Sequence, residues 1–148
     1  MCCKELKEIF GESRSHCITT SSVAKENNRE FRIKSQSGSV ICKIKIDDCL
    51  IDDMNKLKCD YLFKVCNINK FVLVELKGTD IIHAVNQIIA TLDYLKQFLN
   101  FANVEAFIIS SAVPSAAEQR FRNLKESIYR KRGLKISKIH FKHTLPVE

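Results

Sequence analysis

The sequence has few of the residues that interrupt regular structure, with four glycines and two prolines among 148 residues. This scarcity argues against a collagen-like, elastic or linker-dominated chain. The glycines are also dispersed, so the chain has no glycine-rich phosphate loop of the kind found in ATPases and dehydrogenases. Internal repeats and low-complexity tracts are absent as well.

Long apolar runs are lacking too. The run at residues 104–109 is interrupted by Glu105 and falls far short of the roughly 20 residues that a membrane-spanning helix needs. Charged side chains between Lys4 and Glu8 break any hydrophobic segment of a secretory signal. We therefore expect a cytoplasmic protein with no membrane contact.

The chain does have enough apolar residues to build a core. Apolar residues make up 45% and charged residues 28%, and 148 residues fit one domain spanning positions 1–148. Lysine and arginine number 24 against 17 aspartates and glutamates, which gives a net charge of +7. This surplus favours an anionic partner, with nucleic acid the first candidate.

Seven cysteines are a high and odd number. Their spacing contains no C-x-x-C pair of the zinc-knuckle type. Cys42, Cys59 and Cys66 fall in strand-like segments, where a free cysteine behaves as a small buried hydrophobe. In an intracellular protein we expect these thiols to be reduced and structural.

The periodicity of the apolar residues predicts an α/β fold with a mixed β-sheet flanked by helices. Residues 12–28, rich in serine, threonine and asparagine, are expected to form a long loop or a short helix. Asp80 or Thr79 can cap the long helix that begins near residue 80. The expected order is a helix at Cys2–Phe10, strands at 31–33, 40–46, 58–66 and 71–77, the helix from 80 to 99, a strand at Val104–Ser110, a helix at Ser115–Arg132 and a strand at 134–139.

The segments at 58–66 and 71–77 are expected to form a hairpin. An even-numbered turn centred on residues 68 and 69 pairs positions whose numbers add up to 137. Tyr61 then lies opposite Leu76 on an apolar face, and Asp60 lies opposite Lys77 on the other face. Glu75, opposite Leu62, is diagonal to Asp60 and within reach of its side chain.

Two carboxylates and an ammonium at one end of an apolar hairpin suit metal-assisted hydrolysis. Carboxylate oxygens are the ligands that Mg²⁺ prefers, and the metal leaves positions for water and phosphate oxygens. The ammonium of Lys77 can orient water or stabilise charge in the transition state. The alternative is a plain cross-strand ion pair between Asp60 and Lys77. A charge at Glu75, directly after four apolar residues, is costly without a partner and argues against that alternative.

Asp60, followed after fourteen residues by Glu75-Leu76-Lys77, resembles the signature of the PD-(D/E)XK, or restriction-endonuclease-like, nuclease superfamily. The motif spans about 20 residues, and the superfamily's αβββαβ core order is similar to the elements expected up to position 111. Here a C-terminal helix and strand are added. The resemblance implies that Asp60 and Glu75 bind Mg²⁺ or Mn²⁺, that the Leu76 carbonyl adds a ligand, and that Lys77 is the catalytic lysine. Cys59 stands at the motif's proline position, which varies in this superfamily.

The resemblance extends to the helix from residue 80. A glutamine on this helix supports the active site in several branches, so Gln87 is a candidate catalytic residue, with a solvated polar side chain as the alternative. The Gln-x-x-x-Tyr motif of one branch is only partly matched, because Tyr94 lies seven residues after Gln87. Some members add a glutamate from the first helix, which makes Glu8 or Glu12 a further candidate.

Basic residues give candidate contacts to a phosphate backbone. Lys56 and Lys58 flank Asp60, and Arg120, Arg122 and Lys125 lie on the helix at Ser115–Arg132. A solvated helix face is the alternative for this second group. His140 and His143, three residues apart, are expected to be surface residues because no strong third metal ligand accompanies them.

The sequence therefore predicts a metal-dependent nuclease, with DNA favoured over RNA. No recognition domain is evident, which favours structure-selective cleavage over a long specific site. By analogy with single-domain members of the superfamily we expect a homodimer. A catalytically inactive nucleic-acid-binding or protein-interaction module on the same fold, and a structural α/β protein with a decorative Asp–Lys pair, are the alternatives.

Overall fold

The computed structural model describes residues 2–76, 80–111 and 115–148, and only the backbone of residues 115 and 116. Its elements are α1 (Cys2–Phe10), the 3₁₀ helix η1 (Glu12–Cys17), β1 (Ile18–Thr20), β2 (Val23–Glu26), β3 (Arg29–Ser35), β4 (Ile41–Lys45), β5 (Tyr61–Val65), the 3₁₀ helix η2 (Cys66–Ile68), β6 (Lys70–Leu76), α2 (Ile81–Leu95), β7 (Val104–Ser110), α3 (Ser115–Arg132), β8 (Lys135–His140) and β9 (Lys142–Val147).

The larger sheet is mixed and has the strand order β1-β4-β5-β6-β7-β8. Its first four strands are antiparallel to their neighbours, whereas β6, β7 and β8 run parallel. Parallel neighbours need a crossover, and α2 and α3 supply the two crossovers. The carboxyl ends of β6, β7 and β8 therefore meet at one edge of this sheet, which is where ligands bind in open α/β sheets.

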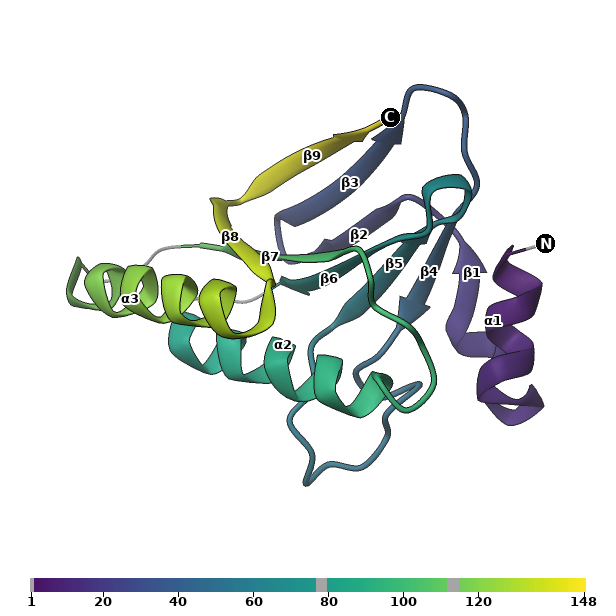
Figure 1. The fold of residues 1–148 in the computed structure, drawn as a ribbon, viewed down its shortest axis with the longest axis horizontal. Helices are drawn as coiled ribbons and strands as arrows, with labels where there is room; N and C mark the ends of the chain where they lie inside the picture. Colours follow the sequence, from purple (N-terminus) through teal and green to yellow (C-terminus); the bar gives the residue numbers. More distant parts are fainter. Residues whose placement is uncertain (1, 77–79, 112–114) are drawn as a thin grey trace.

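A smaller sheet, β2-β3-β9, packs against one face of the larger sheet (Figure 1). Phe31 on β3 is fully buried between the sheets, with its ring centroid 5.7 Å from Phe63 on β5 and 5.1 Å from Phe107 on β7. β9 pairs in parallel with β3, so residues near the two ends of the chain lie side by side. This packing gives the molecule a second apolar core.

Helices cover the other face of the larger sheet. The apolar side of α2 buries Ile81, Val85, Ile88 and Leu92 against this face, and α3 lies alongside α2 (Figure 1). The Asp80 carboxylate caps α2 by accepting a hydrogen bond from the His83 amide at 3.0 Å. The layers are therefore helices, six-stranded sheet and three-stranded sheet.

Several sequence predictions are confirmed. The mixed α/β architecture is present, and α1, β7 and α3 have their predicted bounds. Strands β3 to β6 and β8 lie where alternation placed them, with ends shifted by a few residues. The cap of α2 at Asp80 is also confirmed, whereas Thr79 lies outside the described residues.

Other predictions were wrong. Residues 12–28 contain the short helix that was one of two expectations, as η1, but their strands β1 and β2 and the C-terminal β9 were not foreseen. The structure therefore has two sheets instead of one. Within β9, His143 is half-buried and its ring stacks on Phe107 with centroids 5.0 Å apart, while His140 is exposed as expected.

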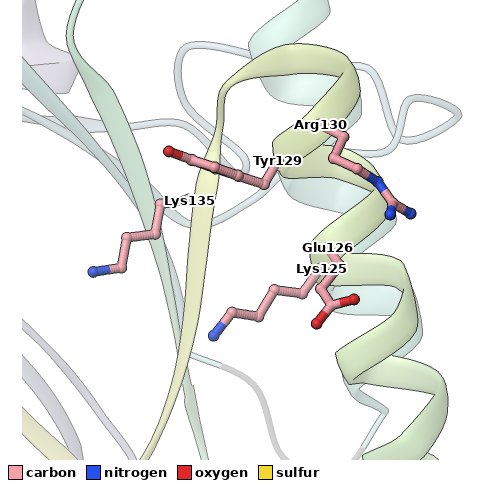
Figure 2. Close-up of a pocket in the computed structure, with 5 residues that line it drawn as sticks. All are labelled: Lys125, Glu126, Tyr129, Arg130 and Lys135. Atoms are coloured by element: carbon pink, nitrogen blue, oxygen red, sulfur yellow. The ribbon is translucent and has the colours of Figure 1, made fainter.

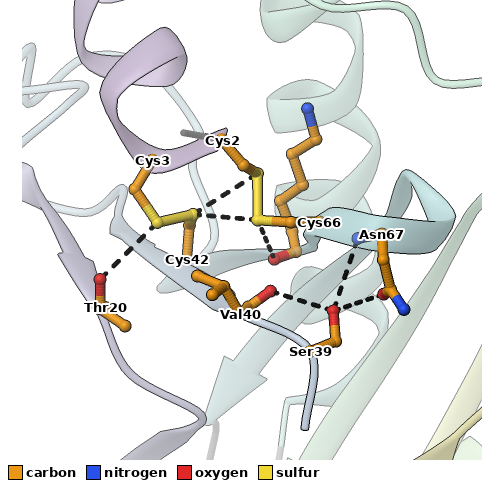
Figure 3. Close-up of a disulfide and its surroundings, with 9 residues drawn as sticks. Cys2, Cys3, Thr20, Ser39, Val40, Cys42, Cys66 and Asn67 are labelled. Atoms are coloured by element: carbon orange, nitrogen blue, oxygen red, sulfur yellow. Dashed lines mark hydrogen bonds between the residues drawn. A yellow bond between two sulfur atoms is a disulfide. The ribbon is translucent and has the colours of Figure 1, made fainter. Parts of the chain in front are cut away.

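The prediction of reduced cysteines is contradicted by three disulfides, Cys2–Cys66, Cys3–Cys42 and Cys17–Cys49. Figure 3 shows the first two. The pairing could not follow from sequence spacing, because 64, 39 and 32 residues separate the partners. Strand pairing and the docking of α1 bring them together. Only Cys59 remains a free, buried thiol, as predicted.

Within the described residues, no helix is both long enough and apolar enough to cross a membrane.

Candidate active site

Asp60 and Glu75 meet across the antiparallel pair β5–β6. The register joins Tyr61 with Val74. Continued by one residue, it places Asp60 opposite Glu75, at the end of β6 that lies on the carboxyl edge of the parallel strands. The two carboxyl groups are close enough to hydrogen-bond to each other.

The predicted register was wrong by two residues. It set Tyr61 opposite Leu76 and Asp60 opposite Lys77 instead of the pairing described above. The turn is the cause, because η2 and a left-handed Asn69 with φ 49° occupy the four positions 66–69. Since the error is even, every side chain keeps its predicted face, and the two carboxyl groups come closer than expected.

The environment of Asp60 favours its protonated form. Burial raises the pKa of this carboxyl group, and the charges of Glu26 and Asp47 raise it further. Two hydrogen bonds oppose these effects and lower the pKa: the Leu76 amide donates to Oδ2 at 2.7 Å, and the Glu75 carboxyl group supplies the other. The net effect is a raised pKa for Asp60, and a cation bound between the two carboxyl groups would favour their charged forms.

The donor set fits a hard divalent cation. Glu75 has only 2% of its surface exposed and lies opposite Asp60 on the neighbouring strand. Two converging carboxyl groups supply the oxygen ligands that Mg²⁺ or Mn²⁺ takes. Leu76 follows Glu75 directly in the chain, and its amide donates to the Asp60 carboxylate at 2.7 Å. Lys77, the predicted catalytic lysine, lies outside the described residues.

Cys59, next to Asp60, takes no part as a thiolate. Burial raises the pKa of its thiol strongly, and the nearby charge of Glu75 raises it further. The side chain therefore remains a neutral, packed thiol, as the sequence predicted.

Helix α2 holds the chain that leads into Asp60. The Gln87 side-chain amide donates to the Lys58 carbonyl at 3.1 Å, and the Thr91 hydroxyl accepts from the Cys59 amide at 2.8 Å. Gln87 therefore acts on the acid pair through the backbone. Its Oε1 atom is buried and has no hydrogen-bond partner among the described residues.

Sequence reasoning missed Glu26 and Asp47, whose charges act on Asp60. Asp47 was assigned to a turn, and Glu26 lies in β2, which was not predicted. The Tyr61 phenol also has a raised pKa, through burial and then through the charges of Asp60 and Glu26. Glu8 and Glu12, the predicted additional glutamates, are exposed on α1 and η1, and no interaction links them to Asp60 among the described residues.

The predicted basic residues fall into two separate groups. Lys56 is exposed, with its Nζ 4.7 Å from the centroid of the Tyr94 ring. Lys58 instead turns inward: its Nζ donates to the Asp53 carbonyl at 3.0 Å, and its side chain is 12% exposed. The ammonium of Lys58 is therefore bonded within its own loop, and a contact with a phosphate would have to replace this hydrogen bond.

The second group lies on α3. Arg120 and Arg122 are exposed, and Arg122 donates to the Gln119 side chain at 3.0 Å. Lys125 lines a cavity of about 520 Å³ together with Glu126, Tyr129, Arg130 and Lys135. Figure 2 shows Tyr129 extending from α3 toward β8, with Arg130 pointing away.

Comparison of the chain with protein-family models, with curated proteins and with solved structures finds no match.

Proposed function

We propose that the protein is a nuclease that uses Mg²⁺ or Mn²⁺ to hydrolyse phosphodiester bonds of nucleic acid. The observation that carries the proposal is the convergence of Asp60 and Glu75, which lie opposite each other across β5–β6 at the carboxyl edge of the parallel strands. Membership of the PD-(D/E)XK superfamily is part of the proposal. It is supported by the spacing of the acidic pair from Lys77 and by the order α1, β4, β5, β6, α2, β7.

In this proposal the chain binds the cation through Asp60, Glu75 and the Leu76 carbonyl. A divalent cation held there would lower the pKa of a coordinated water and shield the phosphate charge. The Leu76 amide donates to Oδ2 of Asp60 and so holds the carboxylate in its orientation. Gln87 holds the backbone carbonyl of Lys58, two residues before Asp60 in the chain. Lys77 is assigned to stabilise charge on the phosphate under attack.

The net charge of +7 and the exposed Lys56, Arg120 and Arg122 support a polyanionic substrate. DNA is favoured over RNA, with structure-selective cleavage by a cytoplasmic homodimer. A dimer places one acid pair on each strand of a duplex.

The test is cleavage of plasmid, branched and single-stranded DNA and of RNA, with Mg²⁺, with Mn²⁺ and with a chelator. We compare the wild type with Glu75→Gln and Lys77→Ala. The matched control is Asp93→Asn, which removes a carboxylate that pairs with Arg132 on α3, away from the acid pair. Metal-dependent cleavage that disappears in both site variants and persists in the control supports the proposal.

Two outcomes contradict hydrolysis. Cleavage that survives Glu75→Gln assigns the activity elsewhere. Salt-sensitive nucleic-acid binding without cleavage under any metal condition identifies an inactive binding module, and the slope of affinity against salt then counts the phosphate contacts.

A further inference from the structure

Four cysteine sulfurs gather where α1 meets β4 and the turn between β5 and β6 (Figure 3). Besides its bond to Cys3, the Cys42 sulfur lies 3.5 Å from the Cys66 sulfur and 3.7 Å from the Cys2 sulfur. Sequence spacing gave no sign of this cluster, because the fold alone brings the four residues together.

The distances between the two disulfides match one metal ion. A tetrahedral zinc ion with Zn–S bonds of about 2.3 Å holds its sulfurs about 3.8 Å apart. The sulfurs of Cys2, Cys42 and Cys66 already lie within 4.8 Å of one another, and Cys3 is bonded to one of them. Once the disulfides are reduced, side-chain rotation is enough to bring each bonded pair to the same spacing.

We propose that, in its reduced form, the protein binds one Zn²⁺ through the thiolates of Cys2, Cys3, Cys42 and Cys66. A thiol reductant of the glutathione or thioredoxin class supplies two electrons and two protons to each disulfide. Zinc then replaces the four thiol protons as the ligands bind. Four soft sulfur donors select zinc over the hard cation assigned to the acid pair.

The surroundings suit a closed structural site. Cys42 is fully buried and Cys3 is 7% exposed, so the fold holds two of the ligands firmly. The Thr20 hydroxyl lies 3.7 Å from the Cys3 sulfur, in position to donate a hydrogen bond. Cys2 and Cys3 occupy the first turn of α1, where the helix dipole favours thiolates.

The site is independent of the proposed nuclease activity. Cys66 follows β5, whereas Asp60 precedes it, so roughly 20 Å of strand separates the two centres. In a reducing compartment the metal would join α1 to the sheet, as the disulfides do in the oxidised protein. The third disulfide, Cys17–Cys49, has only His16 as an additional donor and lacks a fourth ligand among the described residues.

The test uses the full chain, reduced and titrated with Co²⁺ and then with Zn²⁺. We expect the absorption bands of tetrahedral cobalt thiolate at one equivalent, and their loss when zinc displaces cobalt. The variant Cys2→Ser/Cys3→Ser lacks two of the four ligands and should bind zinc more than about 100-fold more weakly. Loss of only a hydrogen-bond partner of one ligand weakens metal binding by about 10–100-fold. Cys17→Ser/Cys49→Ser, the matched control, should retain the spectrum, and the oxidised protein should not bind.

Two results would overturn the proposal. One is a reduced wild type that is folded by circular dichroism yet gives no tetrahedral cobalt spectrum. The other is a spectrum that persists in the Cys2/Cys3 variant and disappears in the Cys17/Cys49 variant. If the serine variants unfold, the wild type alone decides. The proposal then requires that zinc raise the melting temperature of the reduced wild type and leave that of the oxidised wild type unchanged.

Discussion

Asp60→Asn should stabilise the metal-free protein, and by more at neutral pH than at acidic pH. Burial raises the pKa of Asp60 in the folded chain. The folded protein therefore binds more protons than the unfolded chain over the window that begins near the unfolded pKa of about 3.9. Within this window the wild type loses up to about 1.4 kcal/mol of its free energy of unfolding for each unit of rising pH. Asparagine does not titrate, so the variant lacks this loss.

The asparagine variant isolates the charge. Its side-chain oxygen can still accept the hydrogen bond that the Leu76 amide donates to Asp60 at 2.7 Å. Asp60→Ala removes the acceptor as well and leaves the amide unpaired, at a cost of about 1–3 kcal/mol. Comparison of the two variants separates the electrostatic effect from the loss of the hydrogen bond.

The measurement is urea unfolding followed by circular dichroism, at intervals between about pH 4 and pH 8 and with a chelator present. The stability difference between Asp60→Asn and the wild type should grow with pH and then level off. A difference that is constant with pH, or that shrinks, refutes the reasoning. Adding Mg²⁺ should favour the wild type, by about 2.7 kcal/mol at a concentration 100 times the dissociation constant.

Three further predictions concern stability and are measured by urea unfolding at neutral pH. Thr91→Val should cost about 1–3 kcal/mol because it leaves the buried Cys59 amide unpaired, whereas Thr91→Ser should cost much less; equal costs would contradict this role of the hydroxyl. Phe31→Ala should cost about 3–5 kcal/mol because Phe31 is fully buried between the sheets, and a cost below that of a surface substitution would show that the sheets separate readily. Cys17→Ser/Cys49→Ser should cost about 3–4 kcal/mol in the oxidised protein, from a cross-link that spans 32 residues, and should leave the reduced protein unchanged.

The elements that the sequence predicted well are those whose signal is local. The helices at Cys2–Phe10 and Ser115–Arg132 follow from apolar periodicity, and each ends directly before a glycine, Gly11 or Gly133, that the structure places at positive φ. The strand at Val104–Ser110 is a nearly continuous apolar run because it lies between β6 and β8 and is covered on both faces of the sheet. The convergence of Asp60 and Glu75 could be foreseen because it needs only the alternation of two adjacent strands.

The parts that failed depend on distant contacts or on turn geometry. Strand β9 gains its partner in β3, more than a hundred positions earlier, so its own residues carry little evidence of pairing. The hairpin register depends on a left-handed Asn69, which no alternation pattern reports. The disulfides and the charges of Glu26 and Asp47 near Asp60 arise only when remote segments pack together.

The parallel pairing of β3 with β9 also sets the order of events during synthesis. β2 and β3 are made early, but their sheet has no third strand until residues 142–147 leave the ribosome. Until then one face of the nascent β5, β6 and β7, with Phe63 and Phe107 on it, has only a two-stranded hairpin to cover it. A hairpin alone is marginally stable in water, so this face is open to chaperones and to misassociation while translation proceeds.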